Sequence, residues 1–100
     1  MLIVLAKAKV GDGAIDAARD AIAAMEEASR AEEGCIAYTF TQSISDPSVM
    51  LIVEKWVDDA ALAAHFATPH MAAFQGALAN LDVTVEEALK YEASDGQALM

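Results

Sequence analysis

His65 is the residue whose type and setting point most directly to chemistry. It lies between Ala64 and Phe66 in an otherwise alanine-rich segment, so its ring either caps the domain or points into a small cavity. Because imidazole takes up and releases a proton close to neutral pH, His65 is our first candidate for a general base. The alternative is a structural histidine whose ring nitrogens are satisfied inside the fold.

Three further residues could complete a site around such a base. Glu54 stands in the middle of an apolar segment and is expected to point inwards, where burial raises the pKa of a carboxyl group. It would then act as an acid or a base, unless it simply pairs with Lys7, Lys9 or a helix terminus. Trp56, the only tryptophan, and Tyr38 offer a flat ring and a hydroxyl to an aromatic ligand, although both could equally be core anchors.

No spacing in the chain indicates a cofactor or a metal ion. The sequence has no Gly-rich phosphate loop, no Cys-x-x-Cys, no His-Glu-x-x-His and no serine in a nucleophile-elbow motif. His65 and His70 are separated by a helix break at Pro69, which makes a poor register for two ligands of one ion. We therefore expect neither a metal nor a cofactor, with His70 either touching the substrate or closing the turn after Thr68-Pro69.

The elements that must position these residues follow from the periodicity of the apolar side chains. Period-two alternation and β-branched residues predict strands, whereas apolar residues three and four apart predict helices. Thr68 can cap a helix that starts at Pro69, so the second helix is predicted to be divided there. The predicted strands cover 2–10, 35–43, 49–57 and 81–91, and the predicted helices cover 14–32 and the divided segment 58–79. Residues 85–90 could also form a helical turn.

Local signals add detail to this prediction. Asp12 is expected to cap the first helix, and Gly34 is expected to end it. Ile36, Tyr38 and Phe40 are expected to share one face of the second strand. Leu62 and Phe66 are expected on the inner side of the second helix. The order β-α-β-β-α-β is the ferredoxin-like α+β unit, an antiparallel sheet with helices on one face only.

The composition suits one domain that covers its open sheet face with a second copy. The chain has 100 residues, of which 56% are hydrophobic, more than one small core would need. We expect a single domain over residues 1–100, with a loose tail over 93–100. We also expect a homodimer formed through the sheet face that carries no helices.

The charge balance limits the partners of the chain. With 16 Asp and Glu residues against 6 Lys and Arg residues, its formal net charge is −10, which disfavours nucleic acids and anionic membranes. No secretory signal and no apolar run long enough to span a bilayer is present, so we expect no membrane association. Cys35 is the only cysteine and cannot form an internal disulfide, which fits a reducing, cytoplasmic location.

Several motifs together resemble one known family. In chain order they are Glu32-Glu33-Gly34-Cys35, Asp46-Pro47, Glu54-Lys55-Trp56, Ala61-Leu62-Ala63-Ala64-His65 and Thr68-Pro69-His70-Met71-Ala72-Ala73-Phe74. This combination is similar to the antibiotic biosynthesis monooxygenase superfamily, and most similar to its small quinol monooxygenase branch. The resemblance implies a dimeric α+β barrel. It also implies oxidation of a quinol-like or other electron-rich aromatic molecule by O2 without metal, flavin or haem.

The resemblance further implies roles for individual residues. His65 would accept the proton of the substrate hydroxyl or hydrogen-bond its phenolate, with Tyr38 and Glu54 as further catalytic polar groups. The substrate contacts would be Trp56, Phe66, His70 and Phe74.

Two departures from related branches narrow the function. The first strand reads Ala6-Lys7-Ala8 where haem-degrading members have an asparagine, and the last helix has Phe74-Gln75 in place of their haem-ligating histidine. Lys90 is the only basic residue of the last strand, where anthrone-oxidising members use an arginine. These differences argue against haem degradation and against a polyketide substrate.

Two other functions fit the same residues. One is an isomerase or degradative enzyme for a small carbonyl signalling or catabolic compound, in which His65 and Glu54 move protons without O2. The other is a non-catalytic stress module that only sequesters a small hydrophobic ligand. A monooxygenase consumes O2, whereas the isomerase or degradative enzyme does not. A stress module would bind its ligand and release it chemically unchanged.

Overall fold

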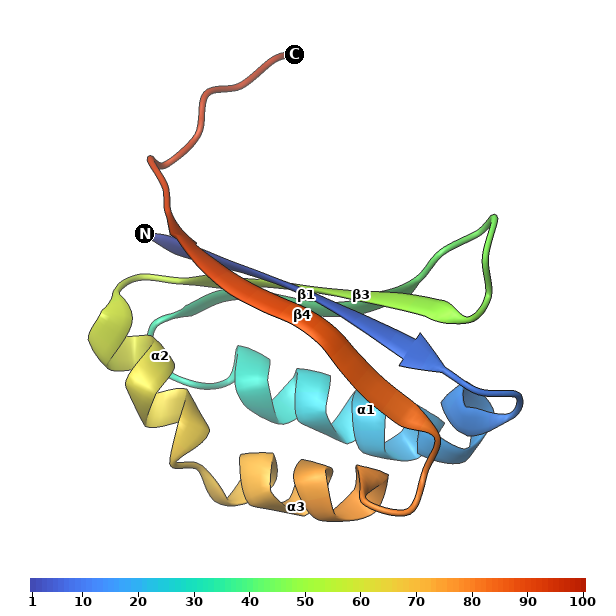
Figure 1. The fold of residues 1–100 in the computed structure, drawn as a ribbon. Helices are drawn as coiled ribbons and strands as arrows, with labels where there is room; N and C mark the ends of the chain where they lie inside the picture. The colour runs from blue at the N-terminus through green and yellow to red at the C-terminus, as the bar shows by residue number, and fades with distance from the viewer.

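A four-stranded antiparallel sheet with helices on one of its two faces makes up the fold (Figure 1). The computed structural model describes all 100 residues. In chain order the elements are β1 (Leu2–Val10), α1 (Ala14–Arg30), β2 (Cys35–Gln42), β3 (Val49–Trp56), α2 (Asp59–Phe66), α3 (Pro69–Leu78) and β4 (Val83–Glu92). The predicted ferredoxin-like α+β fold is confirmed, and so is the division of the second helix at Pro69.

The sheet places the candidate site on its covered face. β1 lies between β3 and β4, and β2 forms the edge beside β3. The register sets Val4 opposite Glu54 on one side of β3 and Tyr38 opposite Glu54 on the other. Because side chains alternate along a strand, every second residue of β3 faces the helices, and these residues are buried: Met50, Ile52, Glu54 and Trp56.

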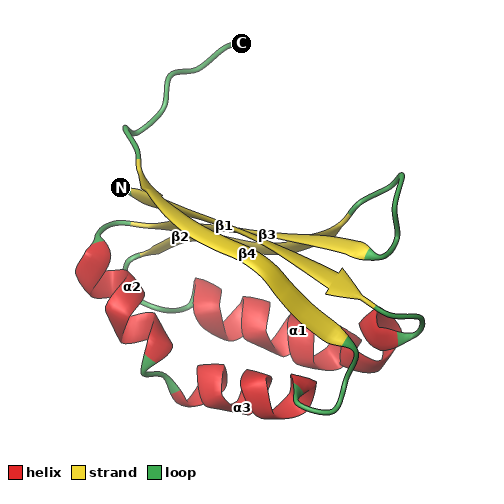
Figure 2. Cartoon of the chain, viewed as in Figure 1, coloured by secondary structure: helices red, strands yellow, loops and turns green.

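The helices form a single layer against this face (Figure 2). α1 packs beside α3, and α2 lies at the end of the sheet where β3 ends. The buried residues of α1 are mostly small, which lets the helix approach the sheet closely: Ala14, Ala18, Met25 and Ser29. None of the three helices is long and apolar enough to cross a membrane.

Two local predictions near the start of the chain are wrong. α1 is preceded by Gly13 in the left-handed conformation, with φ of 77°, and no side chain caps the helix, so Asp12 does not fill that role. In β2 the pairing register shifts between Cys35 and Ala37. This irregularity turns Ile36 outwards and leaves it 52% exposed, whereas Tyr38 is buried, so the two residues do not share one face as predicted.

Two further predictions concern the second half of the chain. In α2 the buried positions are Ala61, Leu62 and His65, so the histidine takes the inner place that the sequence analysis assigns to Phe66. Phe66 is 63% exposed, and its predicted inward orientation is wrong. β4 is extended and pairs with β1 along its length, which excludes the helical alternative for residues 85–90.

Candidate active site

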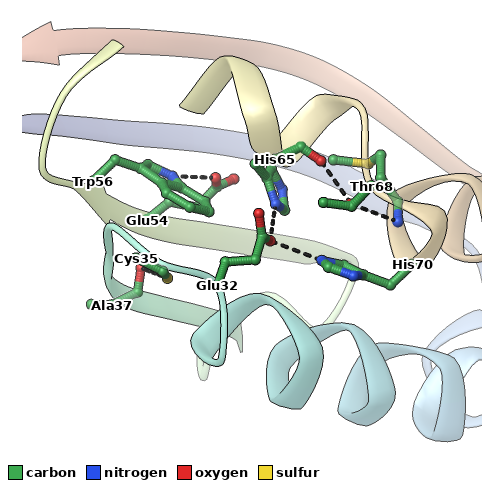
Figure 3. Close-up of polar contacts among 9 residues, drawn as sticks. Glu32, Cys35, Ala37, Glu54, Trp56, His65, Thr68 and His70 are labelled. Atoms are coloured by element: carbon green, nitrogen blue, oxygen red, sulfur yellow. Dashed lines mark hydrogen bonds and ion pairs between the residues drawn. The ribbon is translucent and has the colours of Figure 1, made fainter. Parts of the chain in front are cut away.

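His65, Glu32 and His70 form one hydrogen-bonded cluster beneath the sheet (Figure 3). His65 on α2 is completely buried, and its Nδ1 lies 2.6 Å from Oε2 of Glu32. The same oxygen lies 2.8 Å from Nε2 of His70 on α3. Glu32 comes from the turn after α1, so three segments that are separate in the sequence meet at one carboxylate oxygen.

The break between α2 and α3 brings the two histidines together. The Thr68 hydroxyl donates to the carbonyl oxygen of His65 at 2.8 Å and accepts from the backbone N–H of Met71 at 3.2 Å. One side chain therefore ends α2 and caps α3, which fixes the angle between them. On a continuous helix, residues five apart would point about 140° away from each other.

A close backbone contact at Gly34 holds the turn that carries Glu32 against α2. Gly34 has φ of 87°, and a Cβ added there would lie 2.6 Å from the Cβ of Ala61. Its carbonyl oxygen accepts a hydrogen bond from the backbone N–H of Val57 at 2.9 Å. Only glycine tolerates both the conformation and the approach, and the contact keeps Glu32 within reach of His65.

The second ring nitrogen of His65, Nε2, makes no hydrogen bond. Since a carboxylate can only accept hydrogen bonds, a neutral His65 ring carries its proton on Nδ1 and its lone pair on Nε2. Nε2 is buried and has no hydrogen-bond partner. The Glu32 carboxylate on the far side would stabilise the imidazolium that forms when Nε2 takes up a proton. The pair therefore has the arrangement of a general base held in one tautomer.

Glu54 is buried close to this cluster, and its hydrogen-bond partner is the indole of Trp56. Nε1 of Trp56 donates to Oε1 of Glu54 at 3.0 Å, whereas Lys9 donates to the hydroxyl of Ser48. Burial raises the pKa of Glu54 above its ordinary value of 4.5, while the Trp56 hydrogen bond and the nearby His65 act in the opposite direction. The carboxyl group points inwards, as predicted, but the pairing with a lysine that the sequence leaves open is absent.

We expect Glu54→Gln to stabilise the fold at neutral pH. Because the pKa of Glu54 is raised by folding, the folded protein binds the proton more tightly than the unfolded chain, and the free energy of unfolding falls as the pH rises through the folded-state pKa. Glutamine keeps an oxygen for the indole N–H of Trp56 but carries no charge. Thermal unfolding should show a higher midpoint than wild type at neutral pH and no gain below pH 4.5. An equal gain at both would contradict this account.

Tyr38 and Trp56 enclose the ring of His65. The ring centroids of Tyr38 and Trp56 lie 5.3 Å and 4.7 Å from that of His65. Burial, followed by the negative charge of Glu54, raises the pKa of Tyr38 well above its ordinary value of 10.0. The phenol therefore stays protonated and can donate a hydrogen bond to an anion. Burial also raises the pKa of Cys35, so this residue is a thiol and not a nucleophilic thiolate.

An apolar cavity of about 70 Å³ lies between the sheet and helices α1 and α3. All its lining residues are hydrophobic, and those on the sheet include Phe40 and Ile52. These two residues lie next to Tyr38 and Glu54 on the same face of the same strands. The cavity thus lies on the same covered face as the polar cluster, but neither Tyr38 nor Glu54 lines it. Phe74 of α3 also lines it, with its ring centroid 5.5 Å from that of Phe40.

The structure brings together most of the residues singled out in the sequence. His65, Tyr38, Trp56 and Glu54 share one buried region, and Phe74 lines the neighbouring cavity, as described above. His70 joins His65 through Glu32. Phe66 lies at the surface, with its ring centroid 5.7 Å from that of His65, and does not line the apolar cavity.

Glu32 is the site residue that the sequence analysis misses. It belongs to the Glu32-Glu33-Gly34-Cys35 motif, but nothing in that motif shows which of the two neighbouring glutamates faces inwards. In the structure Glu32 is largely buried and Glu33 is exposed. The choice depends on how the turn after α1 docks against α2 through Gly34.

Glu32, His65 and His70 also have the donor atoms of a metal site. One carboxylate oxygen and two imidazole nitrogens lie within 4.8 Å of one another. The sequence-based prediction that the helix break at Pro69 makes a poor register for a shared ligand set is therefore wrong, because that break turns α3 so that His70 meets the same carboxylate oxygen as His65.

Fold and site together define a class of small α+β proteins. Its features are a ferredoxin-like sheet, a buried histidine–carboxylate pair beneath it and a separate apolar cavity on the same covered face. Residues 1–77 match the family model described as antibiotic biosynthesis monooxygenase. The chain therefore belongs to the antibiotic biosynthesis monooxygenase family, which gives it a monooxygenase-like role.

Solved structures agree with this assignment. A protein from Deinococcus radiodurans, described as a candidate antibiotic biosynthesis monooxygenase, is 28% identical, with a TM-score of 0.89 and coverage of 100% of this chain and 99% of that one. A Bacteroides thetaiotaomicron protein of unknown function, described as a possible oxidoreductase, is 29% identical, with a TM-score of 0.83 and coverage of 92% and 96%.

A curated relative adds sequence similarity without a known activity. The uncharacterized protein sll1783 of Synechocystis is 34% identical over 73 residues, which cover 73% of this chain. The matched region spans 50% of that relative's length.

Proposed function

We propose that this protein is a cofactor-independent monooxygenase that oxidises a quinol-like or similarly electron-rich aromatic molecule with O2. The observation that carries the proposal is the buried Nε2 of His65, which has no partner and has the Glu32 carboxylate behind its ring. Membership of the family supports the reaction class. We place the reaction in the cytoplasm, because the single cysteine, Cys35, is a free thiol.

The proposed reaction begins when Nε2 of His65 takes the hydroxyl proton of the quinol. The resulting phenolate passes one electron to O2, and the two radicals combine to form a C–O bond. Cleavage of the O–O bond then releases water, whose oxygen receives the proton held by His65 and a hydrogen from the ring carbon. A naphthoquinol thus gains one oxygen atom and loses two hydrogen atoms, and the second oxygen atom of O2 leaves as water.

The residues around His65 have supporting roles in this proposal. The protonated phenol of Tyr38 donates a hydrogen bond to the substrate phenolate, and the flat ring of Trp56 helps to orient the aromatic substrate. Glu54, whose pKa is raised by burial, is a second group able to accept a proton, in this case from the ring carbon. Because these groups are buried in surroundings of low polarity, each of the interactions is stronger than it would be at the surface.

Substrate binding requires a wall of the cavity to move. An apolar cavity that takes up benzene has a volume of about 150 Å³, about twice the roughly 70 Å³ observed here. Phe74 lines both this cavity and a surface groove of about 290 Å³ between α1 and α3. We infer that the substrate enters from this groove by displacing the Phe74 ring, which joins the two spaces.

Oxygen uptake tests the proposed function. Purified protein stripped of metals is mixed with a reduced naphthoquinone, and O2 consumption is compared with autoxidation in buffer alone. Uptake clearly above that baseline, with a hydroxylated product, is the expected result. Uptake equal to the baseline for both single-ring and two-ring quinols would overturn the proposal. Carbonyl isomerisation by the same histidine base, or ligand binding without turnover, would then be tested next.

We also propose a homodimer joined through the uncovered sheet face. Large hydrophobic side chains are exposed on that face: Leu5, Leu51, Leu89 and Tyr91. Leu5 and Leu89 are cross-strand partners, so they form one continuous patch. A contiguous apolar patch on a sheet is typical of an interface between protein chains. A second copy of the chain presents a matching surface.

Leu5→Glu is expected to convert this dimer to a monomer. The new carboxylate would be buried without a partner in the interface, which is strongly unfavourable. Sedimentation equilibrium should show a mass of two chains for wild type and of one 10.5 kDa chain for the variant. Ile44→Glu, at a fully exposed position in the β2–β3 hairpin, is the matched control and should stay dimeric. A monomeric wild type, or a dimeric Leu5→Glu protein, would contradict the proposal.

A further inference from the structure

We propose that Glu32, His65 and His70 bind one divalent transition-metal ion, with Zn²⁺ the best-suited ion, and that the bound ion switches off the His65 base. Metal binding, the binding half of this proposal, does not depend on the proposed function. Inhibition of the His65 base by the ion, the inhibitory half, rests on the proposed function. The ligand atoms are Oε2 of Glu32, Nδ1 of His65 and Nε2 of His70. Two imidazoles and one carboxylate are a common Zn²⁺ ligand set, in which a water molecule takes the fourth position.

A small movement converts the hydrogen-bonded cluster into a coordination site. The two nitrogens now lie 2.6 and 2.8 Å from Oε2 of Glu32. Tetrahedral ligands about 2.0–2.2 Å from Zn²⁺ are roughly 3.4 Å apart, so each nitrogen must move away from Oε2 of Glu32 by less than about 1 Å. The two nitrogens already lie within 4.8 Å of each other. His65 is fixed in the core, but His70 lies in the first turn of α3 with 25% of its side chain exposed. His70 and Glu32 can therefore make the adjustment.

An ion can reach this cluster from the groove between α1 and α3. His70 lines that groove, whose volume is about 290 Å³, together with alanines of both helices, Met25 and Phe74. No lysine or arginine lines it, so no protein cation competes for the position. Because His70 is the proposed ligand that lines the groove, the water ligand would come from this side. The site would thus be open on one side and held by the core on the other.

Metal binding would reverse the tautomer of His65. When Nδ1 coordinates an ion, the single proton of a neutral imidazole must sit on Nε2. In the proposed reaction Nε2 has to be unprotonated, because it accepts the proton of the substrate hydroxyl. The ion would therefore stop turnover without entering the apolar cavity, so it should lower kcat and leave substrate binding largely unchanged.

Binding of Co²⁺, whose visible absorption reports its coordination, tests the site without turnover. Protein stripped with a chelator is titrated with Co²⁺, and Zn²⁺ is then added to displace it. We expect one ion per chain in wild type and at least about 100-fold weaker binding in His70→Ala and in Glu32→Gln, since changes even outside the ligand shell cost 10- to 100-fold. Glu33→Gln removes the same charge from the exposed neighbour and is the matched control. Equal affinity in all four proteins, or no binding by wild type, would overturn the site.

Oxygen uptake with one equivalent of Zn²⁺ tests the inhibitory half. We expect the uptake by wild type to fall as Zn²⁺ is added and to return when a chelator removes the ion. Unchanged uptake at full occupancy would overturn this half. If wild type shows no uptake even without metal, the proposed function fails, and the Co²⁺ titration still decides the metal site.

Discussion

Changing His65 to glutamine is expected to reduce the protein-dependent rate of oxygen uptake by about 10²- to 10⁴-fold, the usual contribution of a positioned general base. Glutamine has a similar bulk, and its amide can donate a hydrogen bond to Oε2 of Glu32 as Nδ1 of the imidazole does. It offers no nitrogen lone pair to the substrate, however, so the quinol hydroxyl keeps its proton. Since the lost interaction operates during proton transfer, kcat should fall by more than KM rises.

This result is informative only if the variant folds and still binds its ligand. Thermal unfolding checks the fold, and the fluorescence of Trp56 checks the local environment, because the indole ring centroid lies 4.7 Å from that of His65. Glu33→Gln, in the exposed part of the turn after α1, is the control and should keep the wild-type rate. A His65→Gln protein that retains half of the wild-type rate would reject His65 as the base and assign the proton transfer to another buried group, with Glu54 as the first to test.

The order of helices and strands could be predicted because its signals are local. Thr68 caps α3 and Pro69 begins it, as the residue types indicate. The errors occur where distant parts of the chain decide the outcome. Ile36 faces outwards because the register of β2 shifts against β3, and this pairing is not encoded within β2 itself. Phe66 is exposed because His65, held by Glu32, takes the inner position of α2.

The members of the candidate site could be predicted more easily than their contacts. Residue type alone makes His65 and Glu54 candidates for acid–base chemistry, and the alternation of side chains along the strand predicts that Glu54 points inwards. Their partners depend on geometry across two or more elements. The angle set by Thr68 directs His70 towards Glu32, and the close contact at Gly34 selects Glu32 over its neighbour. Neither the angle nor the contact can be derived from apolar periodicity.

Trp56→Ala is expected to lower the free energy of unfolding by about 3–5 kcal/mol, the usual cost of removing a buried tryptophan side chain. The ring is 0% exposed and packs against His65 and edge-on against Tyr38, whose ring centroid lies 6.3 Å away. A loss of this size is a large part of the roughly 5–15 kcal/mol that stabilises a typical domain. Urea denaturation followed by circular dichroism is the appropriate measurement, because the variant lacks the only tryptophan of the chain.

Trp56→Phe separates the packing of this ring from its hydrogen bond. Phenylalanine fills most of the space but leaves Oε1 of the buried Glu54 without a donor, so we expect a smaller loss of about 1–3 kcal/mol at neutral pH. Because the indole hydrogen bond lowers the pKa of Glu54, its removal should raise that pKa further. The ionised carboxylate is the form that suffers most, so the loss should shrink as the pH falls through the raised folded-state pKa of Glu54 and be smallest below pH 4.5. Equal losses in Trp56→Ala and Trp56→Phe would contradict a contribution of ring volume to stability. A loss that does not depend on pH would contradict a contribution of the hydrogen bond to ionised Glu54.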